Sequence, residues 1–205
     1  VSCLKGDCPS FVSVIPQAGV QPAKPTIPSI ELTDLVEPSD KVLIQGRYAI
    51  HIVGIGGTGV VTVAHLLGYA ALFEGKKVNE LNRTGLAQKG GPVESPVILS
   101  ASEMPPSSFI AAGQCDLYLA ADIVGAVNPV NLQVASIDQT VAIVSRSNIP
   151  TSEMIYNPQV PKVDVEAMEQ LINQFTRSKS NVYIDAQYYA MKLFGNHIVA
   201  NIFHL

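Results

Sequence analysis

The stretch HIVGIGGTGVV, residues 51–61, holds several glycines directly after an apolar run. Their spacing fits G-x-G-x-x-G, which lets the backbone approach a phosphate where a strand turns into a helix. The first N–H groups of such a helix are free and carry a partial positive charge, so they favour an anion. The residues expected to contact a cofactor at this turn are Gly54, Gly56, Gly57, Thr58 and Gly59.

Two other interpretations of these glycines stay open. Glu80 ends the next expected strand, close to where an acidic residue would bind the ribose of NAD, so an NAD(P)-binding oxidoreductase domain is one alternative. In the other, the glycines only allow the strand and the helix to pack closely. The chain would then be a packing or interaction domain without a ligand.

A second polar stretch, RTGLAQKGGP at residues 83–92, lies between two expected strands. Open α/β sheets usually bind ligands at such positions, outside the carboxyl ends of strands. No general base or nucleophile stands beside this stretch, so direct catalysis is less expected there than a ligand contact, a subunit contact or a solvated turn, and the catalytic residues stay unknown. The candidate residues are Thr84, Gly85, Gln88, Lys89, Gly90 and Gly91.

Strand and helix patterns alternate from residue 47 onward. The expected strands cover residues 48–54, 77–81, 93–100, 115–121, 140–146 and 181–186. A helix is expected over 57–75, a second one after the capping residue Asp164, and a last one from about Ala186. This order predicts an α/β fold: a three-layer α/β/α, Rossmann-like domain with a mostly parallel sheet.

One strand carries a proline. Pro96 interrupts the run over 93–100, and a proline cannot donate to a sheet ladder. We therefore expect this strand at a sheet edge or at a bulge.

Composition excludes several classes of function. The net charge is −4 and no basic stripe is present, so nucleic acid is not an expected partner. The longest apolar run is shorter than the roughly 20 residues that span a bilayer, so no membrane contact is expected. The three cysteines are an odd number, which disfavours a disulfide framework and fits a cytoplasmic setting. The chain also looks like a fragment of a larger polypeptide.

Longer stretches resemble a known family. GIGGTGVVTVAHLLGYAALFEGKKVNELNRTGLAQKGGPVES resembles the γ-type domain of the 2-oxoacid:ferredoxin oxidoreductases, most closely the fused indolepyruvate ferredoxin oxidoreductases. The similarity continues through IAAGQCDLYLAADIVGAVNP and YNPQV to KLFGNHIVANIFHL, and so covers residues 47–205. The motifs GIGGTGVV and TGLAQKGGPV are highly specific when they occur together.

The resemblance implies part of an enzyme that oxidatively decarboxylates a 2-oxoacid to an acyl-coenzyme A and passes electrons to ferredoxin. Thiamine diphosphate and the iron–sulfur clusters belong to other domains, so the fragment alone is expected to be inactive and to bind no cofactor except coenzyme A. Lys89 and Arg83 suit the phosphates of that ligand. The expected partners are other domains or subunits of the same oxidoreductase and ferredoxin, within an oligomer.

The resemblance also divides the chain. Residues 1–15 resemble the end of an iron–sulfur segment, in which Cys3 and Cys8 are candidate cluster ligands in the full protein. This irregular N-terminal segment continues as a proline-rich linker over 16–46. The chain departs from the family at SPVIL, where SHVRI is expected; Pro96 and Leu99 stand among these changes and question any polar contact from that strand.

Overall fold

The computed structural model describes residues 46–85, 90–151, 154, 157, 159 and 163–205. The expected iron–sulfur segment, with Cys3 and Cys8, lies outside the described residues, as does all of the linker except Gly46. Gln88 and Lys89 of the second polar stretch also lie outside them.

A seven-stranded sheet forms the centre of the domain. Its strands are β1 (Arg47–Ile55), β2 (Lys77–Glu80), β3 (Arg83–Thr84), β4 (Pro92–Ser100), β5 (Leu117–Ala120), β6 (Val141–Ser145) and β7 (Val182–Ile184). Their order is β2-β4-β1-β5-β6-β7, and β3 pairs with β4. Strand β4 is antiparallel to β1, β2 and β3, whereas β1, β5, β6 and β7 pair in parallel. The other six described strands therefore run in one direction, and the predicted mostly parallel sheet is confirmed.

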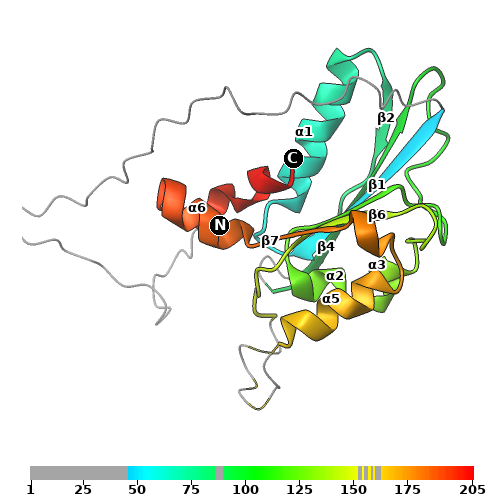
Figure 1. Cartoon of the computed structure of the whole chain (residues 1–205). Helices are drawn as coiled ribbons and strands as arrows, with labels where there is room; N and C mark the ends of the chain where they lie inside the picture. Colours follow the sequence, from blue (N-terminus) through cyan, green and yellow to red (C-terminus); the bar gives the residue numbers. More distant parts are fainter. Residues whose placement is uncertain (1–45, 86–89, 152–153, 155–156, 158, 160–162) are drawn as a thin grey trace, which may run out of the picture.

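Helices cover both faces of this sheet (Figure 1). They are α1 (Val60–Phe73), α2 (Ile123–Ala126), α3 (Pro129–Leu132), α5 (Val165–Asn173) and α6 (Ala186–Phe194), with the 3-10 helices η2 (Ser178–Ser180) and η3 (His197–His204). Ile52 of β1 packs with Val63 of α1 in one core, and Val53 packs with Ile172 of α5 in the other. The predicted three-layer α/β/α architecture is confirmed.

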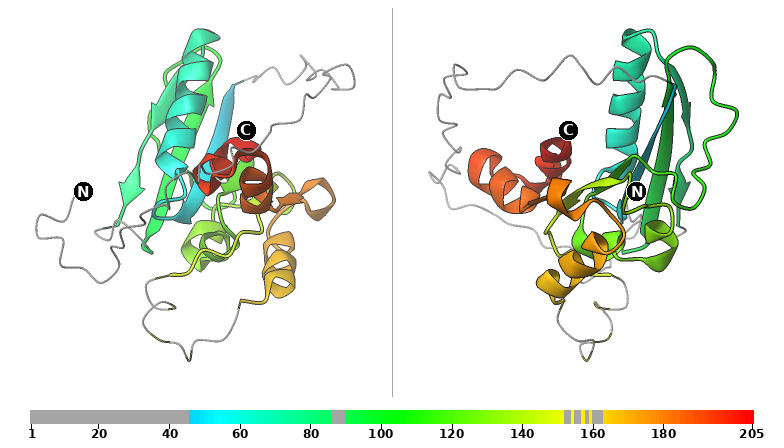
Figure 2. Two further views of the ribbon diagram at one scale, coloured as in Figure 1. Left: turned by 90° about the vertical axis from the view of Figure 1, so that its left-hand side faces the viewer. Right: turned by 45° about the vertical axis from the view of Figure 1, so that its right-hand side comes forward.

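The C-terminal elements lie on the α1 side of the sheet. Helix η3 contacts both α6 and α1, and Figure 2 shows α6 and η3 together beside α1. This brings the end of the described chain back to the first strand–helix unit.

Aspartates begin three of the helices, as their positions after strands or loops predict. The side chains of Asp122, Asp164 and Asp185 each accept a hydrogen bond from the backbone N–H three residues later. Each bond satisfies one of the free N–H groups at a helix start. The helix expected after Asp164 and the last helix, from Ala186, are both confirmed.

The expectation that Pro96 marks a sheet edge or a bulge is wrong. Strand β4 runs unbroken between β1 and β2, and its register with β2 and β3 is the same on both sides of Pro96. The Pro96 carbonyl accepts from Leu81 N at 3.2 Å, in the gap between β2 and β3. Because N–H and C=O of one residue face the same neighbour in an antiparallel strand, the donor that proline lacks also faces this gap.

Helix α5 offers a direct test of the packing. Leu171 and Ile172 are neighbours near its end, yet Ile172 is fully buried and Leu171 is one-third exposed. We expect Ile172→Ala to lower the free energy of unfolding by about 2–5 kcal/mol because it leaves a cavity, and Leu171→Ala to lower it by less than about 1 kcal/mol. Urea unfolding measures both. Equal losses would contradict this orientation of α5.

Candidate functional site

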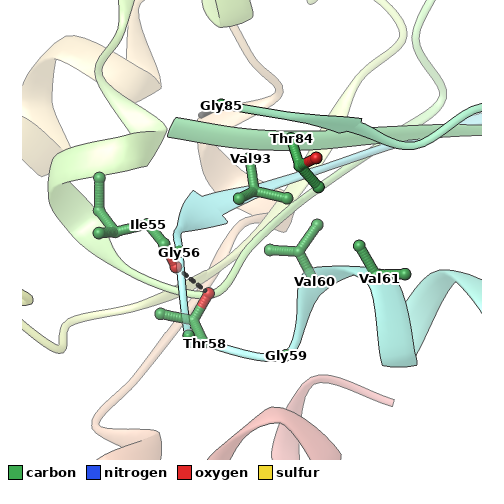
Figure 3. A pocket seen from close by; sticks show the side chains of 10 residues that line it. Ile55, Gly56, Thr58, Gly59, Val60, Val61, Thr84, Gly85 and Val93 are labelled. Carbon is green, nitrogen blue, oxygen red and sulfur yellow. Dashed lines mark hydrogen bonds between the residues drawn. The ribbon is translucent and has the colours of Figure 1, made fainter. Parts of the chain in front are cut away.

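The turn between β1 and α1 is built from glycines in a left-handed conformation. Gly57 has φ of 98° and Gly59 has φ of 83°, values that other residues rarely adopt. Thr58 closes the turn: its N–H donates to the Ile55 carbonyl at 3.1 Å, and its hydroxyl donates to the same oxygen at 2.8 Å (Figure 3). The backbone geometry of this turn therefore favours glycine at positions 57 and 59.

The individual glycines have different roles. A Cβ atom at Gly54 would lie 2.7 Å from Thr58 Oγ1 and 2.9 Å from Val60 Cγ2, so Gly54 permits close packing. Among the residues that the structure describes, a Cβ atom at Gly57 would meet nothing within 4 Å. The packing interpretation is thus right for Gly54, which lines neither of the clefts at the turn, while Gly57 faces open space.

The start of α1 has free donors beside this space. Its N-cap residue, Gly59, has no side chain to cap the helix, and the first turn contains no acidic residue. The first N–H groups of an α-helix have no partner within the helix and carry a partial positive charge. An anion placed here would gain both hydrogen bonds and a favourable field.

A cleft of about 540 Å³ opens between the glycine-rich turn and the end of the β3–β4 ribbon. Figure 3 shows Thr84 and Val93 across from the turn. The lining residues are Ile55, Gly56, Gly57, Thr58, Gly59, Val60, Val61, Thr84, Gly85 and Val93. The structure therefore joins the two polar stretches that the sequence singled out.

A second cleft, of about 240 Å³, lies on the other side of the turn, against the C-terminal elements. Gly56, Gly57, Thr58 and Gly90 line one wall, and Gln187, His197 and Asn201 contribute to the opposite wall. The Asn201 side chain occupies the space where a Cβ atom at Gly59 would lie. Sequence reasoning missed these C-terminal residues, because no local motif marks them and only the packing of η3 on α1 brings them here.

Gly91 fixes the distance between the two stretches. Its carbonyl accepts from Gly56 N at 2.7 Å, and its residue is buried. Gln88 and Lys89 cannot be placed relative to the clefts, since they lie outside the described residues.

Two charged residues are not where the sequence interpretation put them. Arg83 Nη1 lies 3.0 Å from Glu94 Oε1, and Arg83 lines cavities on the α3 side of the ribbon and not the cleft at the turn. Glu80 Oε1 lies 3.1 Å from His65 Nε2 and accepts from Asn82 at 2.7 Å. Neither side chain lines the clefts at the glycine-rich turn, and Pro96 and Leu99 do not line them either.

A buried carboxylate holds the start of the turn. Asp122 is fully buried; its Oδ2 accepts from Ile55 N at 2.6 Å, and its Oδ1 accepts from Gly125 N at 2.6 Å. Burial raises the pKa of Asp122 to about 6, although these backbone hydrogen bonds act in the opposite direction. Asp122 therefore caps α2 and anchors the end of β1 at the same time.

Among the residues that the structure describes, no three His, Cys, Asp or Glu side chains come together as ligands. In the same part of the chain, no helix is long and apolar enough to cross a membrane.

Residues 49–205 match the family described as pyruvate ferredoxin/flavodoxin oxidoreductase. The chain belongs to this family. The match includes both glycine-rich stretches and the C-terminal residues of the second cleft. The family-level resemblance expected from the sequence is thereby confirmed.

A curated relative is similar to part of the chain. Indolepyruvate oxidoreductase subunit IorB of Thermococcus kodakarensis is 36% identical over 85 residues, which are 42% of this chain and 41% of that protein. The match thus spans less than half the length of this curated relative. The likeness to an indolepyruvate-type protein agrees with the resemblance drawn from the motifs.

Two solved structures share the fold. Pyruvate oxidoreductase subunit PORC from Thermotoga maritima aligns over 76% of this chain and 71% of its own, with 17% identity and a TM-score of 0.51. The 2-oxoglutarate:ferredoxin oxidoreductase from Magnetococcus marinus, with 2-oxoglutarate, coenzyme A and succinyl-CoA bound, aligns over 77% of this chain and 23% of its own. Its identity is 13% and its TM-score is 0.51.

The packing role of Gly54 can be tested by stability. We expect Gly54→Ala to lower the free energy of unfolding by about 1–3 kcal/mol, because the new methyl group overlaps Thr58 and Val60. Gly85→Ala is the matched control: its φ is not positive, and the nearest contact of its Cβ atom among the described residues would be the Pro92 carbonyl at 3.6 Å. Chemical denaturation of both variants decides this, and an unchanged stability of Gly54→Ala would refute the packing role.

Asp122 should make stability depend on pH. Since its folded pKa of about 6 lies above its ordinary value of 3.8, the folded state binds the proton more tightly. The contribution of Asp122 to the free energy of unfolding is therefore fully present below pH 3.8. It is lost as the pH rises to about 6, and the total loss is about 3 kcal/mol.

The measurement is the free energy of unfolding of the wild type minus that of Asp122→Asn, which does not titrate. Taking this difference cancels the effect of other titrating groups. One of these is His204, because burial lowers its pKa to about 4. We expect the difference to fall between pH 4 and pH 6. A difference that rises or stays constant over this range would show that the pKa of Asp122 is not raised.

Proposed function

We propose that residues 47–205 form the γ-type domain of a 2-oxoacid:ferredoxin oxidoreductase of the indolepyruvate type, and that the glycine-rich turn binds coenzyme A. The main support is that the family match contains, in one stretch, both polar loops that meet at the turn. The likeness to the IorB subunit supports the indolepyruvate type. Residues 1–15 would then be the end of an iron–sulfur segment and 16–46 a linker.

In the proposed reaction, the bond between the carbonyl carbon and the carboxylate of the 2-oxoacid breaks, and carbon dioxide leaves. The electron pair goes to ferredoxin, and the acyl group joins the sulfur of coenzyme A, whose thiol proton is released. Thiamine diphosphate and iron–sulfur clusters, which belong to other domains, would hold the electron pair between its release from the 2-oxoacid and its transfer to ferredoxin. This chain's part would be to bind and orient the thiol substrate, and the chain alone would be inactive.

The turn suits the diphosphate of coenzyme A for three reasons. The start of α1 offers N–H donors without a side-chain cap, and Gly57 leaves open space beside them. The exposed Thr84 can add a hydroxyl from the opposite wall of the cleft. Backbone donors at a helix start are a common solution for binding phosphates. The coenzyme A bound to the fold neighbour from Magnetococcus marinus makes this ligand the one to test first.

The proposed contact residues are the sequence candidates that line the two clefts, with the unplaced loop residues added. They are Gly56, Gly57, Thr58, Gly59, Thr84, Gly85, Gly90 and, from the sequence alone, Gln88 and Lys89. Gly91 would act through its backbone bond to Gly56, and Gly54 through packing. The partners would be other domains or subunits of the oxidoreductase, with ferredoxin as electron acceptor.

The alternative of an NAD(P)-binding domain loses support from the strand order. In a dinucleotide-binding sheet the second strand lies next to the first, which puts the acidic residue within reach of the ribose. Here the antiparallel β4 lies between β1 and β2, so Glu80 is one strand further from the turn. Its carboxylate also faces His65, in the middle of α1.

A pair of glycines allows a clean binding test. Gly57 and Gly75 both have positive φ and open space around the missing Cβ, but only Gly57 lines the clefts. Both alanine variants should therefore lose similar stability, about 1 kcal/mol. In the assembled oxidoreductase that contains this chain, we expect Gly57→Ala to weaken coenzyme A binding at least about tenfold and Gly75→Ala to leave it unchanged.

Isothermal titration with coenzyme A and, separately, with NADH measures these affinities. Equal coenzyme A affinity in the two variants would contradict the proposed site. Binding of NADH that is lost in Glu80→Gln would favour the NAD(P) alternative, whereas no binding of either molecule would favour a packing domain.

A further inference from the structure

His51 is a buried histidine that the proposed function does not use. It lies in the middle of β1 and is 4% exposed, on the face of the sheet that α2 and α3 cover. Its ring lies 5.8 Å from that of Tyr118, tilted by 40°. Neither ring nitrogen has a hydrogen-bond partner among the residues that the structure describes. An unpartnered polar group at such a depth costs free energy, so it needs an explanation.

A charged pair lies next to this imidazole. Glu94 Oε2 is 3.8 Å from His51 Nε2, and the other oxygen of Glu94 is 3.0 Å from Arg83 Nη1. Burial lowers the pKa of His51, and the nearby Glu94 and the Asn131 side chain only partly oppose this effect. The imidazole is therefore neutral at pH 7, with one donor and one acceptor nitrogen.

The same residues line a cavity of about 180 Å³ that is separate from the clefts at the glycine-rich turn. Its polar lining residues are His51, Arg83, Glu94 and Gln133, and its apolar walls include Phe109, Ile110, Val130 and Val134. A cavity of about 150 Å³ with apolar walls holds one benzene molecule. The space therefore fits a single ring.

We propose that this cavity binds a small hydroxylated aromatic molecule, with the hydroxyl group between His51 and Glu94 and the ring against the apolar walls.

The geometry selects this chemistry. An oxygen atom can lie about 2.8 Å from both His51 Nε2 and Glu94 Oε2, because these two atoms are 3.8 Å apart. A hydroxyl group can donate to the carboxylate and accept from the imidazole in that position, whereas a carboxylate ligand would be repelled by Glu94. The apolar walls gain from a ring, which shields them from water.

Strand β4, which pairs with β1, offers His51 no polar side chain directly opposite. His51 faces Pro96 directly in the β1–β4 register, at the place where the family resemblance expected a histidine on the other strand. The imidazole therefore reaches the α3 side of the sheet from β1, where Glu94 of β4 can meet it.

The probe is phenol, titrated into the full 205-residue chain while the imidazole nitrogens are observed by long-range proton–nitrogen NMR correlation. The variant His51→Gln assigns the signals. We expect a saturating shift of the His51 nitrogens with phenol, and binding of fluorobenzene, which has no hydroxyl, that is about tenfold weaker. No saturating shift, or equal affinity for the two molecules, would overturn the proposal.

A rim variant keeps the test independent of the buried histidine. Val130 is mostly exposed at the cavity, so Val130→Phe should fill the space without disturbing the core and should abolish phenol binding. Val182→Phe, at a half-exposed site on β7 outside the cavity, is the matched control and should leave binding unchanged. Undiminished phenol binding in Val130→Phe would place the molecule elsewhere and refute the site.

Discussion

Two short hydrogen bonds hold the turn on which the rest of the site depends. Ile55 N donates to the Asp122 carboxylate at 2.6 Å, and Gly56 N donates to the Gly91 carbonyl at 2.7 Å. The first bond ties the end of β1 to the start of α2, and the second ties the turn to the second polar loop. Directly after these anchors, the backbone turns through the left-handed glycines Gly57 and Gly59, which direct the start of α1 toward the clefts.

The reversed strand β4 gives the domain its particular chemistry. Because it lies between β1 and β2, it brings Gly91 to the glycine-rich turn and moves Glu80 away from it. The same strand puts Glu94 on the α3 face, across from His51. One topological change thus weakens the case for NAD, supports a phosphate site formed by two loops, and creates a second polar cavity.

Local features of the fold could be predicted from the sequence. The turn after β1, the helix caps at Asp122, Asp164 and Asp185, and the parallel strands follow from spacing and residue type within a few positions. The prediction for Pro96 was wrong because a proline, which has no N–H to donate, fits inside a sheet where the neighbouring strand is interrupted opposite it. Here that interruption is the gap between β2 and β3. Single-strand patterns carry no information about such a coincidence.

The candidate site could be predicted only in part, for a related reason. Both glycine-rich stretches carry motifs, and their meeting could be inferred from strand ends. Asn201 and His51 have no motif, and their positions depend on how η3 packs on α1 and on which face of β1 points to α3. Arg83 looked suitable for a phosphate, yet its register on β3 places it opposite Glu94. The positions of these three side chains therefore depend on strand pairing and helix packing, which the local sequence does not specify.

The most direct test of the central claim is hydrogen–deuterium exchange of the assembled oxidoreductase with and without coenzyme A. If the glycine-rich turn binds this ligand, amides in residues 55–62 and 90–93 will exchange more slowly in its presence, while those around Gly75 will not change. If these segments exchange at the same rate under conditions in which the enzyme turns over coenzyme A, the ligand binds elsewhere and the account of this site is wrong.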